Sequence, residues 1–293
     1  VSNSGEQGLL GITSVENEVY LFFTEAFHDG GRALENRVYK YTWDGNELIQ
    51  PILLKGMPGT EREYVGGELV SDLDGIVYAV TGENYKIGLL QNHLKDESYR
   101  HFSQTGSSDE KASRTISHSL TYALSCVKIS FYHYTTNSFG WQSVQPDLSN
   151  NPLELNLFNI LGNLDSCARQ FYYENFSDGH WKDTSSIIQI EPKGEYAAIG
   201  IRNSFGLAVD PKTGYLWDTE NGADVYDEIN LVENKFNSGW AKIQGPSNGE
   251  TLPEIPEYKN YRYSEPEFSW ELPVGVTAIE FPNSIDFKKY KDF

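Results

Sequence analysis

Cysteine and long apolar runs are the two features that this chain most clearly lacks. The 293 residues include only 2 cysteines, Cys126 and Cys167, and neither lies in a CxxC or other metal-type spacing. The two thiols could form one disulfide or remain separate and buried, and the sequence does not decide between these states. No apolar run approaches the roughly 18 residues that a membrane-spanning helix needs, so no span is expected.

Positive charge is also scarce. The chain has 23 Lys and Arg against 42 Asp and Glu, which gives a formal net charge of −19. Such a surface repels phosphates and anionic lipid, so neither nucleic acid nor a membrane surface is an expected partner. The acidity is compatible with cation binding and with an extracytoplasmic location, whether periplasmic, secreted or cell-surface. The chain starts with Val, which leaves open a leader that has already been removed.

What the chain has instead is aromatic residues and repeated hairpin patterns. Aromatic residues make up 14% of the sequence and favour strands. Residues 67–82 and 206–220 each show an apolar stretch, a Gly turn and an alternating stretch, with the same spacing from the first Gly to the turn Gly. A third copy starts at Gly8, and Gly275 looks like the opening of a fourth. Each copy predicts a β-hairpin.

Repeated strand units of this kind predict an all-β fold, and a β-propeller in particular. The alternative is a β-sandwich whose hairpins resemble one another by coincidence. Residues 91–183 break the rhythm, because they are polar and then aromatic with weak periodicity. We interpret residues 91–183 as a long insertion between blades of a single propeller domain that spans residues 1–293.

Four motifs resemble those of the soluble sugar dehydrogenases that use pyrroloquinoline quinone (PQQ), the glucose/sorbosone dehydrogenase family. They are GEQGLLGI from Gly5, GGELVSDLDGIVYAVTGE from Gly66, GIRNSFGLAVDPKTGYLWDTENG from Gly200, and DEINLVENKFNSGWAKIQG from Asp227. They occur in the family's order, and the last two are adjacent and long. The resemblance implies a six-bladed β-propeller, which at both ends of this chain is shorter than the family's pattern.

The same resemblance implies a cofactor site. It places PQQ against Arg202, whose fixed guanidinium suits the negative charge that builds on the quinone oxygens. Asn203 would donate to the cofactor beside Arg202, and Glu6 and Asn221 complete the implied cofactor contacts. The implied activity is oxidation of a sugar at its anomeric carbon, with hydride passing to the quinone.

Calcium is the second implied cofactor. In the family, the turn after the TE-x-G motif presents backbone carbonyl oxygens to Ca²⁺, and the matching residues here are Gly222 and Ala223. Glu228 matches a ligand of a second, structural calcium found in some members. Without the motif, Asp227 and Glu228 would read as a solvated turn.

One departure bears directly on activity. The family's catalytic base is the His of an H-x-GG motif, and here Tyr64 stands in that position. A tyrosine with an ordinary pKa near 10 is a poor base at neutral pH. Three functions therefore stay open: a PQQ-dependent sugar dehydrogenase, which is an oxidoreductase, with reduced activity; a non-catalytic propeller that binds a protein or a carbohydrate; and a calcium-dependent hydrolase of the lactonase type.

Overall fold

The computed structural model describes residues 1–59, 61–84, 89–93, 176–177 and 180–282. The chain divides into two compact units, one made of residues 1–95 and 180–293 and the other of residues 96–179. The described residues hold sixteen strands and one short 3-10 turn, η1 (Leu89–Gln91). The predicted all-β class is confirmed. Cys126 and Cys167 lie outside the described residues, as does most of the predicted insertion.

The first sheet is a four-stranded antiparallel meander. Its strands lie in sequence order, and the third predicted hairpin, from Gly8, is confirmed as β1 and β2. The turn between β3 and β4 forms because the Asp44 carboxylate accepts the backbone N–H groups of Asn46 and Glu47, at 2.8 and 2.9 Å. The four strands are β1 (Leu9–Val15), β2 (Glu18–Ala26), β3 (Ala33–Trp43) and β4 (Leu48–Met57).

The second sheet joins strands that lie far apart in the sequence. Its order is β15-β14-β10-β9-β6-β5, and β6 pairs antiparallel with β9. The segment between β6 and β9 therefore connects two neighbouring strands of one sheet, whereas the sequence analysis placed the insertion between blades. The strands are β5 (Gly66–Ser71), β6 (Val77–Thr81), β9 (Ser186–Glu191), β10 (Tyr196–Ile199), β14 (Phe236–Asn237) and β15 (Arg262–Tyr263).

The third sheet has the order β11-β12-β13-β16 and is antiparallel throughout. The predicted hairpins at 67–82 and 206–220 are confirmed as β5–β6 and β11–β12. The predicted fourth copy is wrong as far as it is described, because residues 275–282 form no strand. The strands are β11 (Ser204–Val209), β12 (Leu216–Glu220), β13 (Asp227–Val232) and β16 (Phe268–Trp270); two short strands, β7 (Phe176–Ser177) and β8 (His180–Trp181), complete the set.

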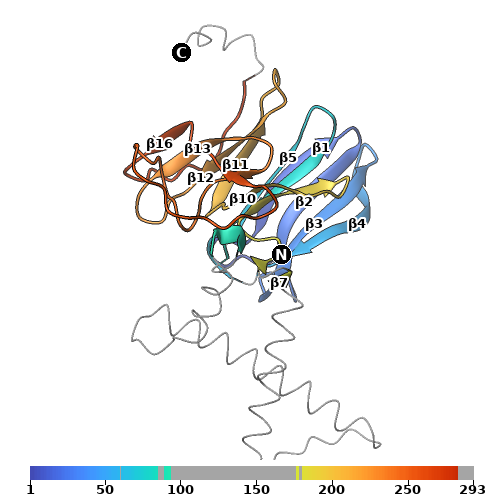
Figure 1. The fold of residues 1–293 in the computed structure, drawn as a ribbon. Coiled ribbons are helices and arrows are strands. Elements are labelled where there is room, and N and C mark those ends of the chain that lie inside the picture. The colour runs from blue at the N-terminus through green and yellow to red at the C-terminus, as the bar shows by residue number, and fades with distance from the viewer. Residues whose placement is uncertain (60, 85–88, 94–175, 178–179, 283–293) are drawn as a thin grey trace, which may run out of the picture. The chain divides into compact units, whose positions relative to one another are not determined.

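The three larger sheets of the first unit pack side by side, with β5 between β1 and β11 (Figure 1). One apolar core joins the first and second sheets through Phe22, Val38 and Ile188, and another joins the second and third through Ile187 and Leu207. β1 and β5 approach so closely that a Cβ on Gly11 would lie 2.6 Å from the carbonyl oxygen of Gly67. Because β1, β5 and β11 lie together, the residues that precede them also converge.

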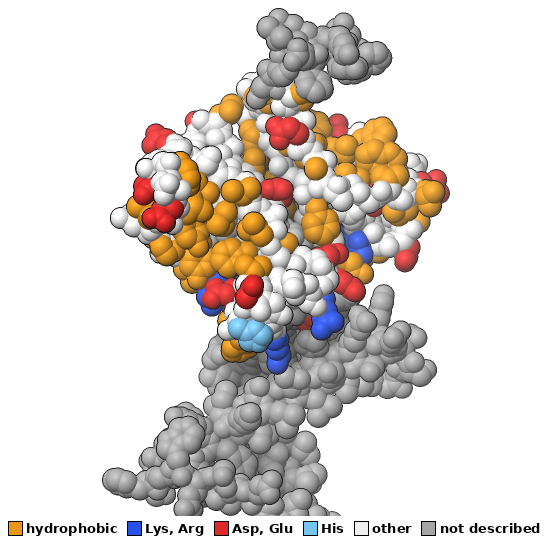
Figure 2. Space-filling model, turned by 180° about the vertical axis from the view of Figure 1, so that it is seen from behind, with side chains coloured by type: hydrophobic (Ala, Val, Ile, Leu, Met, Phe, Trp, Pro, Cys, Tyr) orange, Lys and Arg blue, Asp and Glu red, His pale blue; other side chains and the backbone are white. Residues whose placement is uncertain are grey.

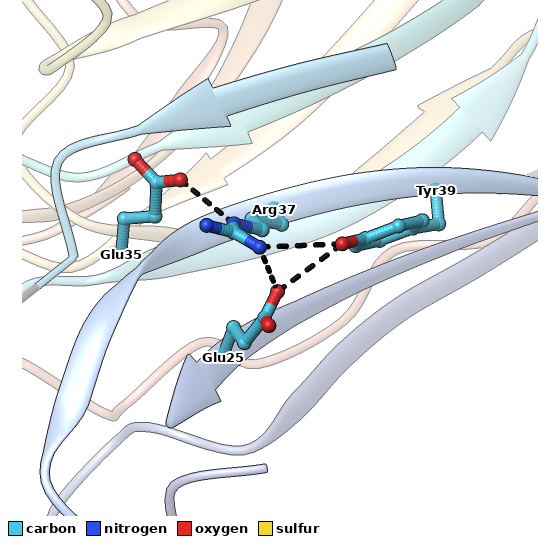
Figure 3. Close-up of polar contacts among 4 residues, drawn as sticks. All are labelled: Glu25, Glu35, Arg37 and Tyr39. Atoms are coloured by element: carbon cyan, nitrogen blue, oxygen red, sulfur yellow. Dashed lines mark hydrogen bonds and ion pairs between the residues drawn. The ribbon is translucent and has the colours of Figure 1, made fainter. Parts of the chain in front are cut away.

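The charged groups on β2 and β3 are paired (Figure 3). The Arg37 guanidinium contacts the carboxylates of Glu25 and Glu35, the latter at 2.7 Å from Nε, and the Tyr39 hydroxyl donates to Glu25 at 3.3 Å. The hydrogen bonds of the Arg37 guanidinium to Glu35 and, next in size, to Tyr39 raise the pKa of Arg37 above its ordinary value. Figure 2 shows hydrophobic side chains gathered on one face of the molecule. Ile12, Ile52 and Phe268 are among the exposed large hydrophobic residues of the protein.

Candidate functional site

Residues that precede the three central strands meet at one end of the sheets. Asn203, just before β11, accepts the Gly66 backbone N–H with its Oδ1 at 3.1 Å, and its Nδ2 donates to the Glu6 carboxylate at 3.4 Å. Glu6 Oε2 in turn accepts the Val65 backbone N–H at 3.1 Å. Sequence positions 6, 65 and 203 are thus linked by one hydrogen-bonded network.

Arg202 is the buried cation of this network. Its side chain is only 7% exposed, and its Nη1 donates to the backbone carbonyl oxygens of Asn221 at 2.8 Å and Gly222 at 2.7 Å. Its Nε–H is buried, and the described residues supply no acceptor for it. Because a buried donor without a partner costs free energy, this N–H is a group that an acceptor from outside the described residues would satisfy.

Two aromatic rings hold the Arg202 guanidinium in place. Its central carbon lies 4.4 Å from the centre of the Tyr64 ring and 5.7 Å from that of Trp240. The Trp240 indole N–H donates to the Glu83 carboxylate at 2.7 Å, which fixes the second ring. Stacking covers the faces of a guanidinium, while its N–H groups point outward in its plane, so the rings orient Arg202 without using up its donors.

Tyr64 itself adopts an unusual backbone conformation. Its φ angle is 58°, in the left-handed region that few residues other than glycine adopt. Its carbonyl oxygen accepts the Asn84 backbone N–H at 3.1 Å, which secures the bend. Histidine is enriched in this region of backbone space, so the position tolerates the imidazole that the family motif has there.

The turn after β12 is built around Gly222 and Asp227. A Cβ on Gly222 would lie 2.0 Å from the Val225 carbonyl oxygen, so only glycine fits. Asp227 accepts the Gly222 backbone N–H at 2.9 Å, and its other oxygen accepts the N–H groups of Val274 and Gly275 at 2.8 and 2.6 Å. The Asp227 carboxylate therefore holds the turn at Gly222 to the segment at Val274 and Gly275.

This turn does not fit the calcium ion that the sequence analysis placed at Gly222 and Ala223. The Gly222 carbonyl oxygen already accepts a hydrogen bond from the Arg202 cation, and a divalent ion there would lie beside that positive charge. Ala223 is exposed. Within the described ranges, no group of three or more His, Cys, Asp and Glu side chains forms a metal-ligand set.

Behind Arg202, the third sheet buries three carboxylates. Asp218 and Glu220 alternate on β12 and so share one face, and Glu220 is the register partner of Glu228 on β13. All three side chains are at most 6% exposed. Glu228 accepts the Gly245 backbone N–H, whereas both Asp218 oxygens and Glu220 Oε2 find no hydrogen-bond donor among the described residues.

Burial sets the protonation of these acids. Loss of solvation, followed by the neighbouring Glu228 charge, raises the pKa of Asp218 to about 7. Loss of solvation also raises the pKa of Glu228 to about 7, against a hydrogen bond from Gly245 that lowers it. The pKa of Glu220 is raised well above its ordinary value by the same causes, although a hydrogen bond from the Arg202 backbone opposes the rise. Perturbed acids of this kind are typical of functional sites.

Most of the predicted site residues lie together. Glu6, Arg202, Asn203 and Asn221 are connected by hydrogen bonds, and Tyr64 joins them by stacking on Arg202. Glu228 lies on β13 and belongs to the buried acidic group. The sequence analysis missed four residues that shape the site; the GW and WDTE stretches within the recognised motifs contain three of them. The four are Glu83, Asp218, Glu220 and Trp240.

Comparison with known proteins points to sugar dehydrogenases. Residues 178–292 match the sequence model of the Glucose / Sorbosone dehydrogenase family. Aldose sugar dehydrogenase YliI of Escherichia coli is 30% identical over 112 residues, which is 37% of this chain and 30% of that protein. A second curated relative, the uncharacterized protein slr1608 of Synechocystis, is 30% identical over 96 residues, 32% of this chain and 23% of its own length.

Solved structures of aldose sugar dehydrogenases have a fold similar to that of this chain. The apo form of the soluble aldose sugar dehydrogenase from Escherichia coli matches 98% of this chain and 65% of its own length, with a TM-score of 0.55 and 17% identity. The PQQ-bound aldose sugar dehydrogenase from Streptomyces coelicolor matches 96% and 59%, with a TM-score of 0.50 and 18% identity. The chain thus spans less than a third of the curated relatives and less than two thirds of these solved structures. In its motifs, and in the match of residues 178–292, the chain is similar to the glucose/sorbosone dehydrogenase family, the resemblance that the sequence analysis stated.

Proposed function

We propose that this chain is a PQQ-dependent sugar dehydrogenase-like protein of the six-bladed propeller type, an oxidoreductase whose activity is reduced because Tyr64 replaces the catalytic histidine. The observation that carries the proposal is the buried Arg202, which is fixed by two aromatic rings and has an N–H without an acceptor among the described residues. The expected substrate is an aldose, oxidised at its anomeric carbon, and the expected location is extracytoplasmic.

Arg202 fits an electron-rich planar ligand. Its guanidinium stays charged and offers donors in one plane, so it can bind quinone oxygens, and the contacts to Asn221 and Gly222 prevent it from turning away. Asn203 and Asn221 lie beside it, and Glu6 orients the Asn203 amide. When bound, PQQ would supply the hydride acceptor, and these residues would hold it in position.

The proposed site lacks a good proton acceptor, because Tyr64 occupies the position of the histidine base. Removal of the sugar hydroxyl proton needs a base whose pKa is near neutral, a role that suits an imidazole better than a phenol. The Arg202 guanidinium lies over the Tyr64 ring, so this residue acts first as a support for the cation. General-base catalysis typically contributes about 10²–10⁴-fold, and we expect the wild-type chain to lack most of that factor.

Calcium stays in the proposal at Glu228 alone. Beside Glu228, the buried carboxylates of Asp218 and Glu220 have oxygens that find no donor among the described residues, and hard oxygen ligands of this kind suit Ca²⁺. A bound cation would let these acids ionise, because it would offset the desolvation that raises their pKa values. The side chains would have to draw together to become ligands, since they do not form a ready set.

The second candidate function is a non-catalytic propeller that binds a protein or a carbohydrate. Tyr64 favours it, because this residue stands where the resemblance places the histidine that removes the sugar hydroxyl proton. The two candidates differ in a measurable way: the dehydrogenase binds PQQ at Arg202, and the binding protein does not.

Dye reduction with PQQ, calcium and a panel of aldoses tests the proposal. We expect weak turnover by the wild-type chain and a rise of at least tenfold in Tyr64→His, since an imidazole restores a base near neutral pKa. Tyr64→Phe is the matched control, because it keeps the ring against Arg202 and adds no base. Strong turnover by Tyr64→Phe would show that another residue is the base, and no turnover by any variant would favour the non-catalytic candidate.

A further inference from the structure

A cavity of about 480 Å³ lies at the other end of the strands from Arg202. It is lined by residues of the second and third sheets, among them Tyr78, Gln189, Tyr215 and Val232. Its size is within the range of roughly 300–1,000 Å³ that small-molecule sites have. The cavity is therefore a candidate binding site that is separate from the proposed cofactor site.

The position of the cavity follows from the strand register. Ser204 pairs with Glu220 beside Arg202, while Val209 pairs with Leu216 at the opposite end of the same hairpin, next to the cavity. Five residues of strand separate the two ends, which is about 16 Å. A ligand in the cavity would not contact Arg202.

Two tyrosines form the aromatic part of the lining. Tyr215 is 57% exposed, and its hydroxyl makes no hydrogen bond with the described residues. Tyr78 is half-buried and its hydroxyl donates to Asp72 Oδ2 at 3.4 Å, so its ring is held in place. The buried Leu216 and Val232 give the lining an apolar component between them. An exposed flat ring beside an apolar surface suits the C–H face of a sugar.

The polar part of the lining provides acceptors and amides but no unpaired cation. Lys235 is paired with the Glu195 carboxylate. The Asp72 carboxylate is engaged within its own turn, where it accepts the backbone N–H groups of Asp74 and Ile76 at 2.9 and 2.8 Å. Anionic ligands are therefore disfavoured, because no positive charge in the lining is left to meet them.

Two polar side chains remain available. Neither Glu233 nor Asn234 makes a side-chain hydrogen bond within the described part of the chain. A carboxylate and an amide together offer the acceptors and the donors that neighbouring sugar hydroxyls require. We propose that this cavity is a carbohydrate-binding site, which takes one or two sugar units stacked on Tyr215 and hydrogen-bonded to Glu233 and Asn234. It goes beyond the proposed oxidation, because a sugar bound here lies about 16 Å from Arg202 along the strands.

Isothermal titration calorimetry with glucose, maltose and cellobiose tests this site on the full chain. We expect at least one of these sugars to bind with a Kd near or below about 1 mM. Tyr215→Ser should raise the Kd about fivefold or more, because it removes the ring, while Tyr215→Phe should keep it within about twofold. Asn234→Ala should also weaken binding, and Phe27→Ser, an exposed residue of the first sheet's β2–β3 loop, is the matched surface control.

The outcomes separate this site from the proposed cofactor site. Sugar binding that survives Arg202→Ala and is weakened by Tyr215→Ser supports the cavity, whether or not PQQ binds. Binding that is lost in Arg202→Ala and unchanged in Tyr215→Ser overturns it, and so does the failure of all three sugars to bind. If spermidine binds in a Tyr215-dependent and salt-sensitive way while the sugars do not, the cavity recognises cations and the inference is also wrong.

Discussion

The first and third sheets differ in the surroundings of their acidic residues, which are ion-paired and partly exposed in the first and buried in the third. On β2 and β3, the carboxylates of Glu25 and Glu35 meet Arg37 at a partly exposed position. On β12 and β13, Asp218 and Glu228 are buried, and loss of solvation raises the pKa of each to about 7. Stability alone explains the first arrangement. The second costs free energy at neutral pH, which is what a site that awaits a cation or a ligand would show.

The largest expected effect is a fall in stability with rising pH. Because burial raises the pKa values of Asp218 and Glu228 to about 7, the folded state binds more protons than the unfolded state between about pH 4 and 7. In chelator, the free energy of unfolding should therefore be about 1–3 kcal/mol lower at pH 7.5 than at pH 5.5. Urea unfolding at the two pH values measures this. Equal stability would show that these acids stay ionised in the folded protein.

Calcium should reverse much of that loss. At a concentration 100 times its Kd, a ligand that binds only the folded state adds about 2.7 kcal/mol. We expect millimolar calcium to raise the thermal midpoint more at pH 7.5 than at pH 5.5, because its ligands must be ionised. Glu228→Gln should remove the effect. The same midpoint in calcium and in chelator at both pH values would contradict a calcium site at Glu228.

Removal of one buried charge should help the chelated protein. Asp218→Asn keeps the shape of the side chain and eliminates a desolvated acid, so it should raise the free energy of unfolding by about 1 kcal/mol at pH 7.5 and by less at pH 5.5. Thermal denaturation would detect this, since about 1 kcal/mol shifts the midpoint of a domain of 150–250 residues by roughly 2–4 °C. A lower midpoint at pH 7.5 would mean that the Asp218 charge is compensated.

The smallest effect should come from the first sheet. Ion pairs with this much solvent contact contribute about 0.2–1 kcal/mol, so Arg37→Ala should destabilise by no more than that and should leave PQQ and calcium binding unchanged. A double-mutant cycle with Glu25→Ala isolates the pair. A coupling energy well above 1 kcal/mol would contradict this prediction, because the Arg37–Glu25 pair would then affect stability as much as the buried acids of the third sheet.

The hairpins and most of the site could be predicted because their signals are local. The equal spacing in 67–82 and 206–220 reflects a turn glycine that both hairpins need. The RN stretch precedes the first strand of the β11–β12 hairpin and the TE-x-G stretch ends the second, so both lie at its open end and Arg202 lies near Gly222. The pairing of β6 with β9 could not be predicted in this way, since it joins residues about a hundred positions apart and no local pattern encodes it.

The electrostatics of the site also lay beyond the sequence. Asp218 reads as an ordinary polar residue in WDTE, and only the packing of the sheets reveals that it is buried without a donor. The sequence analysis recognised Tyr64 as a substitution for histidine. It could not predict that Tyr64 stacks on Arg202 or that its backbone is left-handed, because the YVGG stretch contains no signal for either.

Equilibrium binding of PQQ tests the central claim, which is that the Arg202 group is a ligand site and the first sheet a scaffold. Quenching of tryptophan fluorescence is the readout, because Trp240 lies beside the guanidinium. The account predicts saturable binding by the wild-type chain and by Arg37→Ala, and at least tenfold weaker binding by Arg202→Ala. Equal binding by the wild type and Arg202→Ala, or none by the wild type, would contradict it.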